Sequence, residues 1–142
     1  MLGLLAGCGA PEVTTEEFIA RADAICRETK DEVASLPPPR LPSEIEEHVK
    51  RAALIIDDGL DRLRQLEIPE ADRPTVEGFF RALQDSVGYL PGFGRAAARN
   101  KTIKLQEATE KLEETSERAQ DIATAFGFKV CGGVSDQDLG ST

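Results

Sequence analysis

The sequence KTIKLQEATEKLEETSERAQDIATAF, residues 101–126, decides the fold. Its apolar and small side chains recur at alternating spacings of three and four, the pattern of a helix that packs lengthwise against other helices. The seam comprises Leu105, Ala108, Leu112, Thr115, Ala119, Ile122 and Phe126. Gly127 suits the left-handed conformation that ends a helix, and Phe128 can then fold back onto it. The stretch therefore predicts a long amphipathic helix that requires helical partners.

A first helix is predicted over residues 15–36 by apolar side chains at the same helical spacing. Thr14 and Glu17 form a capping box at its start. Asp23 and Arg27 stand four residues apart, so we expect them to pair on the exposed face of this helix.

A second helix is predicted over residues 43–66, after the proline-rich segment 37–42, which cannot continue a helix. Ser43 and Glu46 form its capping box. His48, the single histidine of the chain, stands among glutamates near the start of this helix. We expect it on the surface.

A third helix is predicted from Asp72 or Arg73, with Pro74 in its first turn. One proline and three glycines fall within residues 88–94. Because these residues disturb helices, we expect this helix to kink or break there and to resume briefly over residues 95–99.

Four amphipathic helices with short connections pack best as an up-down-up-down bundle, so the predicted fold is all-α. Such a bundle brings the end of the fourth helix beside the start of the first. The predicted organisation is a truncated lipoprotein signal peptide at 1–7, a lipidated tether at 8–13, the four-helix domain at 14–131 and a flexible tail at 132–142.

The composition limits the classes of function. The chain has 142 residues, 40% of them hydrophobic and 30% charged, which suits one globular domain. Its formal net charge of -9 argues against a nucleic-acid binder, which needs a positive surface. The same charge disfavours binding to anionic lipid by charge alone.

The N-terminal segment Leu5-Ala6-Gly7-Cys8 resembles the lipobox of bacterial lipoproteins. The resemblance implies that the Cys8 thiol carries a diacylglyceryl group, which would anchor the chain at the extracytoplasmic face of the cell membrane. Only seven residues precede Cys8, and none is Lys or Arg, whereas a working signal needs a charged region and a longer apolar region. We therefore expect a truncated signal; a cytosolic protein with an apolar start is the alternative.

The cysteine count supports this anchor, because three cysteines leave one over after any disulfide. If Cys8 carries lipid, Cys26 and Cys131 remain as a pair, which an exported domain can keep oxidised. Cys26 lies about 18 Å along the first helix, and residues 127–131 span about 17 Å when extended. We predict a disulfide from the first helix to the C-terminal tail; two free buried thiols are the alternative.

Two segments, FIARADAIC at 18–26 and AFGFKVC at 125–131, resemble those of small, uncharacterised actinobacterial lipoproteins and secreted helical proteins. The resemblance covers most of the chain. It implies a location outside the cytoplasm and no particular activity.

Motifs for catalysis or cofactor binding are not found in the sequence. It contains no GxSxG elbow, glycine-rich phosphate loop or HExxH helix. A di-iron bundle needs a Glu-x-x-His on each of two helices, but Ile45 stands three residues before His48 and there is no second histidine. We expect no metal site, no cofactor and no enzymatic activity.

A basic cluster on this acidic chain is the first candidate binding surface. It consists of Arg95, Arg99, Lys101 and Lys104. The bundle topology places it, with residues 37–42, at the end away from the membrane. An anionic envelope polymer or protein would dock there; a solvated turn is the alternative. We therefore expect a non-enzymatic binding or structural module of the cell envelope.

A pocket for a small apolar ligand beside Pro91 is the second candidate. Its lining would be Phe79, Phe80, Tyr89 and Phe93. The competing interpretation is that these rings fill the core around the kink. A carrier of such a ligand is accordingly the alternative function.

Overall fold

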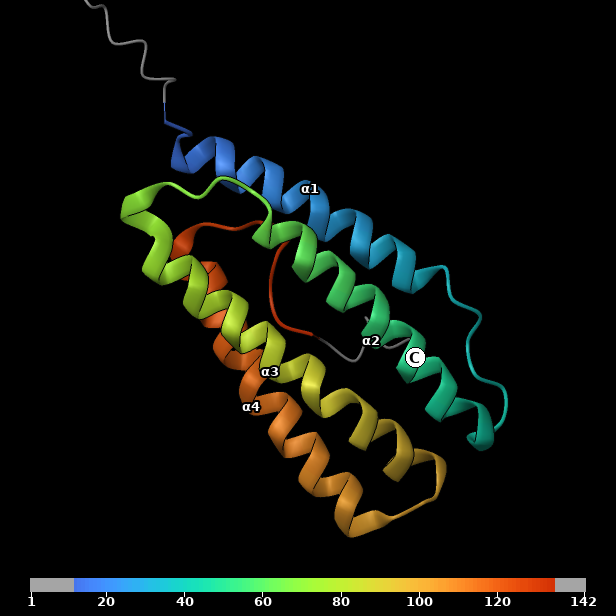
Figure 1. Cartoon of the computed structure of the whole chain (residues 1–142). Coiled ribbons are helices and arrows are strands. Elements are labelled where there is room, and N and C mark those ends of the chain that lie inside the picture. The colour runs from blue at the N-terminus through green and yellow to red at the C-terminus, as the bar shows by residue number, and fades with distance from the viewer. Residues whose placement is uncertain (1–11, 135–142) are drawn as a thin grey trace, which may run out of the picture.

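The computed structural model describes residues 12–134 and folds them into four α-helices and one short 3-10 helix (Figure 1). The elements are α1 Thr15–Ala34, α2 Pro42–Arg64, η1 Glu70–Asp72, α3 Arg73–Ala98 and α4 Thr102–Phe126. No strand occurs within residues 12–134. The predicted all-α fold is confirmed, and successive helices run in opposite directions (Figure 1).

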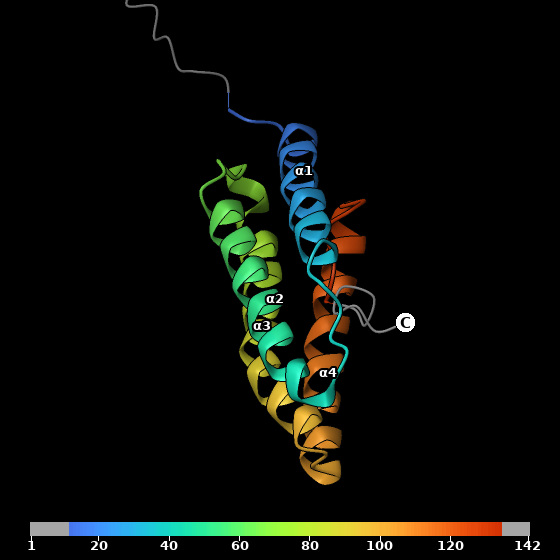
Figure 2. The ribbon, with the colours of Figure 1, turned by 90° about the vertical axis from the view of Figure 1, so that its right-hand side faces the viewer.

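The helices pack in chain order. α2 packs against α1 and α3, and α3 packs against α4. α1 and α4 have no comparable contact, because the segment that follows α4 lies between them (Figure 2). The ring of four helices is therefore closed by an extended segment.

Local signals set two of the helix ends as predicted. Thr14 Oγ1 accepts the Glu17 backbone N–H at 3.1 Å and caps α1, which is one of the two hydrogen bonds of the predicted capping box. Gly127, with a φ of 106°, ends α4 in the left-handed conformation. The N–H of Phe128 then donates to the Ala123 carbonyl at 3.0 Å, and the Phe128 ring is buried.

The start of α2 differs from the prediction. The helix begins at Pro42, and the carboxylate that caps it belongs to Glu44. Glu44 Oε2 accepts the backbone N–H of Arg40 at 2.8 Å and that of Leu41 at 3.3 Å. The predicted capping box of Ser43 and Glu46 is therefore wrong, because proline fits the first turn and moves the helix start one residue earlier.

α3 passes through Pro91 as one helix, so of the kink or break predicted there, the break does not occur. Proline removes only one backbone N–H donor from the helix. The side chain of Leu90, the residue before Pro91, is fully buried and keeps this part of α3 in the core. The nearby glycine has a packing role. A Cβ on Gly94 would lie 3.0 Å from the Val49 Cβ, so this glycine lets α2 approach α3 closely.

The core consists of two clusters of buried side chains. The larger, near the start of α1, includes an aromatic group with ring centroids 4.9 to 6.1 Å apart. Its rings are Phe18, Phe79, Phe126 and Phe128. The second cluster comprises Val33, Val49, Ala52, Ala53, Leu90 and Leu112. The fully buried Ser86 bonds to Thr115 Oγ1 at 3.0 Å and joins α3 to α4.

Candidate functional site

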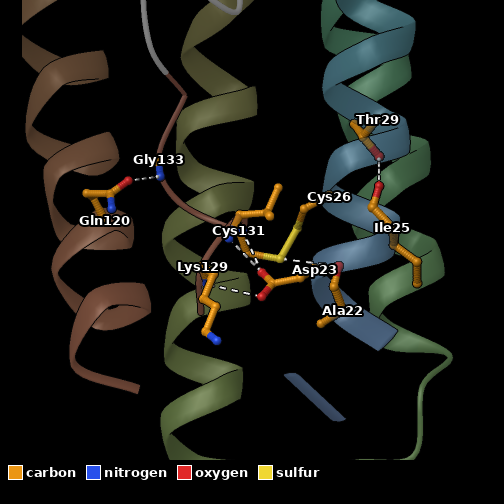
Figure 3. Close-up of a disulfide and its surroundings, with 10 residues drawn as sticks. Ala22, Asp23, Ile25, Cys26, Thr29, Gln120, Lys129, Cys131 and Gly133 are labelled. Atoms are coloured by element: carbon orange, nitrogen blue, oxygen red, sulfur yellow. Dashed lines mark hydrogen bonds between the residues drawn. A yellow bond between two sulfur atoms is a disulfide. The ribbon is translucent and has the colours of Figure 1, made fainter. Parts of the chain in front are cut away.

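The C-terminal segment 127–134 is covalently fixed to α1 (Figure 3). Cys26 and Cys131 form a disulfide with Cα atoms 5.2 Å apart and a sequence separation of 105. The predicted pairing is confirmed. Cys8, the predicted lipidation site, lies outside the described residues, so its lipidation stays a prediction.

A buried carboxylate holds the same segment beside the disulfide. Asp23 accepts the backbone N–H groups of Lys129 at 3.0 Å and of Val130 and Cys131 at 2.9 Å (Figure 3). The predicted exposed pair of Asp23 with Arg27 is wrong, because Asp23 is only 7% exposed and faces the tail. One feature of the sequence indicated this contact: Asp23 lies three residues before Cys26, on the same face of the helix.

The tail is ordered beyond the disulfide. The N–H of Gly133 donates to Gln120 Oε1 on α4 at 3.2 Å. A Cβ on Gly133 would lie 2.1 Å from the Ser116 carbonyl oxygen, so only glycine can lie this close to α4. Val134 packs against the second core cluster. The first residues of the tail predicted to be flexible from residue 132 thus contact α4 and the core through Val134, and residues 135–142 lie outside the described part.

The predicted basic cluster is assembled at the α3–α4 turn. Its side chains line one open depression of about 510 Å³ together with Lys111 and Glu107. We name the five cations, Arg95, Arg99, Lys101, Lys104 and Lys111, the basic tip. Lys111 was not part of the predicted cluster, although Lys104, Ala108 and Lys111 follow the spacing of one helix face.

The cations of the basic tip are left unneutralised, with one exception. Lys111 lies 3.9 Å from Glu114, but within residues 12–134 no carboxylate lies within 4.0 Å of the other four. Of the twelve cations outside the tip, six are paired with carboxylates within residues 12–134, as in the α1–α2 contact of Glu28 with Arg62 at 2.6 Å, and six are not. The tip is thus a local positive surface on a chain of formal net charge -9.

The four rings predicted to line a pocket beside Pro91 do not gather there; an open depression beside Pro91 is lined instead by Lys50, Ala53, Leu54, Asp57 and Val87. Phe79 and Phe80 are buried in the first core cluster, whereas Phe93 packs against the second. Tyr89 is exposed on the surface. A continuous helix separates Phe79 from Phe93 by about 21 Å, so one pocket cannot collect all four rings.

A small apolar cavity lies elsewhere, under the tail. Its volume is about 60 Å³, and α1, α2, α3 and residues 132–134 surround it. Its walls include Cys26, Val33, Leu60, Leu83 and Val134. The cavity has less than half the volume of an engineered site of about 150 Å³ that holds benzene.

His48 is buried, which corrects the predicted surface position. Its side chain is 8% exposed, and its Nδ1 lies 3.1 Å from the Pro37 carbonyl oxygen. The proline-rich segment folds over the first turns of α2 and covers the imidazole. His48 therefore joins this segment to α2.

Neither a metal-binding cluster nor a membrane-spanning helix is found in the described part. No group of three or more His, Cys, Asp or Glu side chains in residues 12–134 has a metal-binding arrangement. Among the helices of this part, none combines the length and apolar character needed to cross a membrane. Comparison with known proteins finds no matching family model, no similar curated protein and no similar solved structure.

Proposed function

We propose that this chain is a non-catalytic, lipid-anchored module at the extracytoplasmic face of the cell membrane, and that its basic tip binds an anionic component of the envelope. One observation carries the binding function. Five cations from α3, α4 and the turn between them line one depression at one end of an acidic protein. Such a surface attracts anionic groups that the rest of the molecule repels.

The disulfide supports a location outside the cytoplasm. Disulfides persist in oxidising compartments and are rare in the cytosol. The Cys26–Cys131 bond uses two of the three cysteines and leaves Cys8, in its lipobox-like segment, for the lipid. A diacylglyceryl group with a further acyl chain holds a protein stably, where a single chain would not.

The arrangement of the helices supports a tip that points away from the anchor. α1 begins at one end of the bundle, and the α3–α4 turn lies at the opposite end (Figure 1). α3 has 26 residues and therefore extends about 39 Å. A lipid on Cys8 would place the membrane near the start of α1 and the basic tip far from it.

The anchor is tested by the intact mass of the protein isolated from membranes of its own host, with and without reductant. We expect a diacylglyceryl adduct on a chain that begins at Cys8 and gains two hydrogens on reduction. A chain that keeps Met1 and three free thiols would overturn the proposed location.

The binding function is tested by sedimentation of the protein with isolated cell envelopes. The variant carries Arg95→Glu, Arg99→Glu, Lys101→Glu and Lys104→Glu. We expect binding to be lost, and binding of the wild type to weaken as salt rises. Unchanged binding of this variant would refute the role of the tip.

A further inference from the structure

Exposed aliphatic side chains accompany the cations at the tip. Ile103 stands between Lys101 and Lys104 in the first turn of α4 and is 74% exposed. Leu41, 59% exposed, lies at the start of α2, at the same end of the bundle (Figure 1). These two are among the four large hydrophobic side chains that residues 12–134 expose. Water solvates such side chains poorly, so a partner with an apolar layer would cover them.

We infer that the basic tip binds the surface of a bilayer that contains anionic phospholipids and faces the tip, opposite the membrane that would hold the Cys8 anchor, with Ile103 entering the headgroup layer. The inference rests on the proposed function, because it names the partner of the same tip. Cations attract the lipid phosphates, and an aliphatic side chain gains free energy when it leaves water for the acyl boundary. A dissolved polyanion would satisfy the cations and leave Ile103 in water.

The charge distribution explains how an acidic protein can make this contact. Electrostatic interactions are screened over about 8 Å at physiological ionic strength. Binding to a surface therefore depends on the charges close to the contact and not on the net charge of the whole protein. Beyond Lys111, α4 carries Glu113, Glu114, Glu117 and Asp121. These carboxylates are repelled by anionic lipid, which restricts the contact to the tip.

The test is co-sedimentation of the full chain, with Cys8→Ser to remove the anchor, with phospholipid vesicles. The vesicles contain equal amounts of phosphatidylglycerol and phosphatidylcholine, or phosphatidylcholine alone. Inorganic polyphosphate serves as the dissolved polyanion. We expect binding to the anionic vesicles and little binding to pure phosphatidylcholine.

Two variants separate the electrostatic part from the apolar part. Arg95→Gln with Arg99→Gln should weaken binding to anionic vesicles about fivefold for each cation removed. Ile103→Gln should weaken it about tenfold and leave polyphosphate binding unchanged. The matched controls, Arg21→Gln with Arg27→Gln and the exposed Leu54→Gln, should leave both unchanged.

The outcomes separate this inference from the proposed function. Unchanged vesicle binding by Ile103→Gln, or equal binding to both vesicle types, overturns the bilayer as partner. Binding to polyphosphate but not to vesicles, dependent on Arg95 and Arg99, overturns the bilayer and leaves the anionic-partner function standing. If vesicles, polyphosphate and cell envelopes all fail to bind, both proposals fall.

Discussion

Asp23 Oδ1 accepts the backbone N–H of Cys131 at 2.9 Å, across 108 residues of sequence. The disulfide partner of Cys131 stands three residues after Asp23 on the same helix. One turn of α1 thus holds the tail by a covalent bond and by a carboxylate that accepts three amides. This double attachment closes the bundle on the side where α1 and α4 make few direct contacts.

Replacing Asp23 with Asn should lower the free energy of unfolding by about 3 kcal/mol. The amide keeps one acceptor oxygen and turns a donor toward backbone N–H groups, so amides of the tail lose their partner. Urea unfolding with the disulfide intact measures the effect. Asp31→Asn, an exposed aspartate of the same helix, is the control and should change little. Equal effects of the two substitutions would show that the Asp23 contacts are unimportant.

Removing the disulfide with Cys26→Ser and Cys131→Ser should destabilise the protein by about 2–5 kcal/mol. The crosslink closes a loop that spans a sequence separation of 105, and opening it returns conformational entropy to the unfolded chain. The helices should persist, because α2, α3 and α4 contain no cysteine and pack against one another in chain order. Far-UV circular dichroism and thermal unfolding distinguish these effects. A fully unfolded double variant would contradict the prediction.

The losses from Asp23→Asn and from removal of the disulfide should be less than additive. Both attachments hold the same segment, residues 127–134. Once one substitution has released this segment, the remaining attachment contributes less to the free energy of unfolding, so the second substitution has a smaller effect. A double-mutant cycle should give a coupling energy of about 1 kcal/mol or more. Additive losses would mean that the carboxylate and the disulfide act independently.

Gly133→Ala should destabilise the protein by about 1–3 kcal/mol. The new methyl group would lie 2.1 Å from the Ser116 carbonyl oxygen, which belongs to the backbone of α4 and cannot rotate away. Gly88→Ala is the matched control, because nothing lies within 4 Å of its Cβ position in α3. It should stabilise the protein by about 0.5–1 kcal/mol. Thermal unfolding of the two variants should therefore shift in opposite directions.

Some features of this protein follow from local chemistry and were predictable from the sequence. The spacing of apolar residues gives four helices because each buries one face against its neighbours. Gly127 ends α4 because glycine adopts a positive φ without steric cost. The Cys26–Cys131 pair followed from the cysteine count and from the reach of residues 127–131. Four of the five cations of the tip were predictable because they lie at or beside one helix–helix turn, whereas Lys111, farther along α4, was not predicted.

Other features depended on contacts between residues that are distant in sequence. Asp23 has a helical partner at the usual spacing in Arg27, yet three amides more than 100 residues away outweigh that exposed pair. His48 stands among glutamates in sequence but is covered by the segment at Pro37.

At Pro91 the local cost of a missing donor is smaller than the gain from keeping Leu90 buried in a continuous α3. The sequence by itself therefore determined the helices, the crosslink and the charge of the tip, because each depends on neighbouring residues or on simple reach. Only the tertiary structure decided which polar side chains are buried and how the tail closes the bundle. Those outcomes depend on the total free energy of contacts between residues that are distant in sequence, and a local sequence pattern does not predict such contacts.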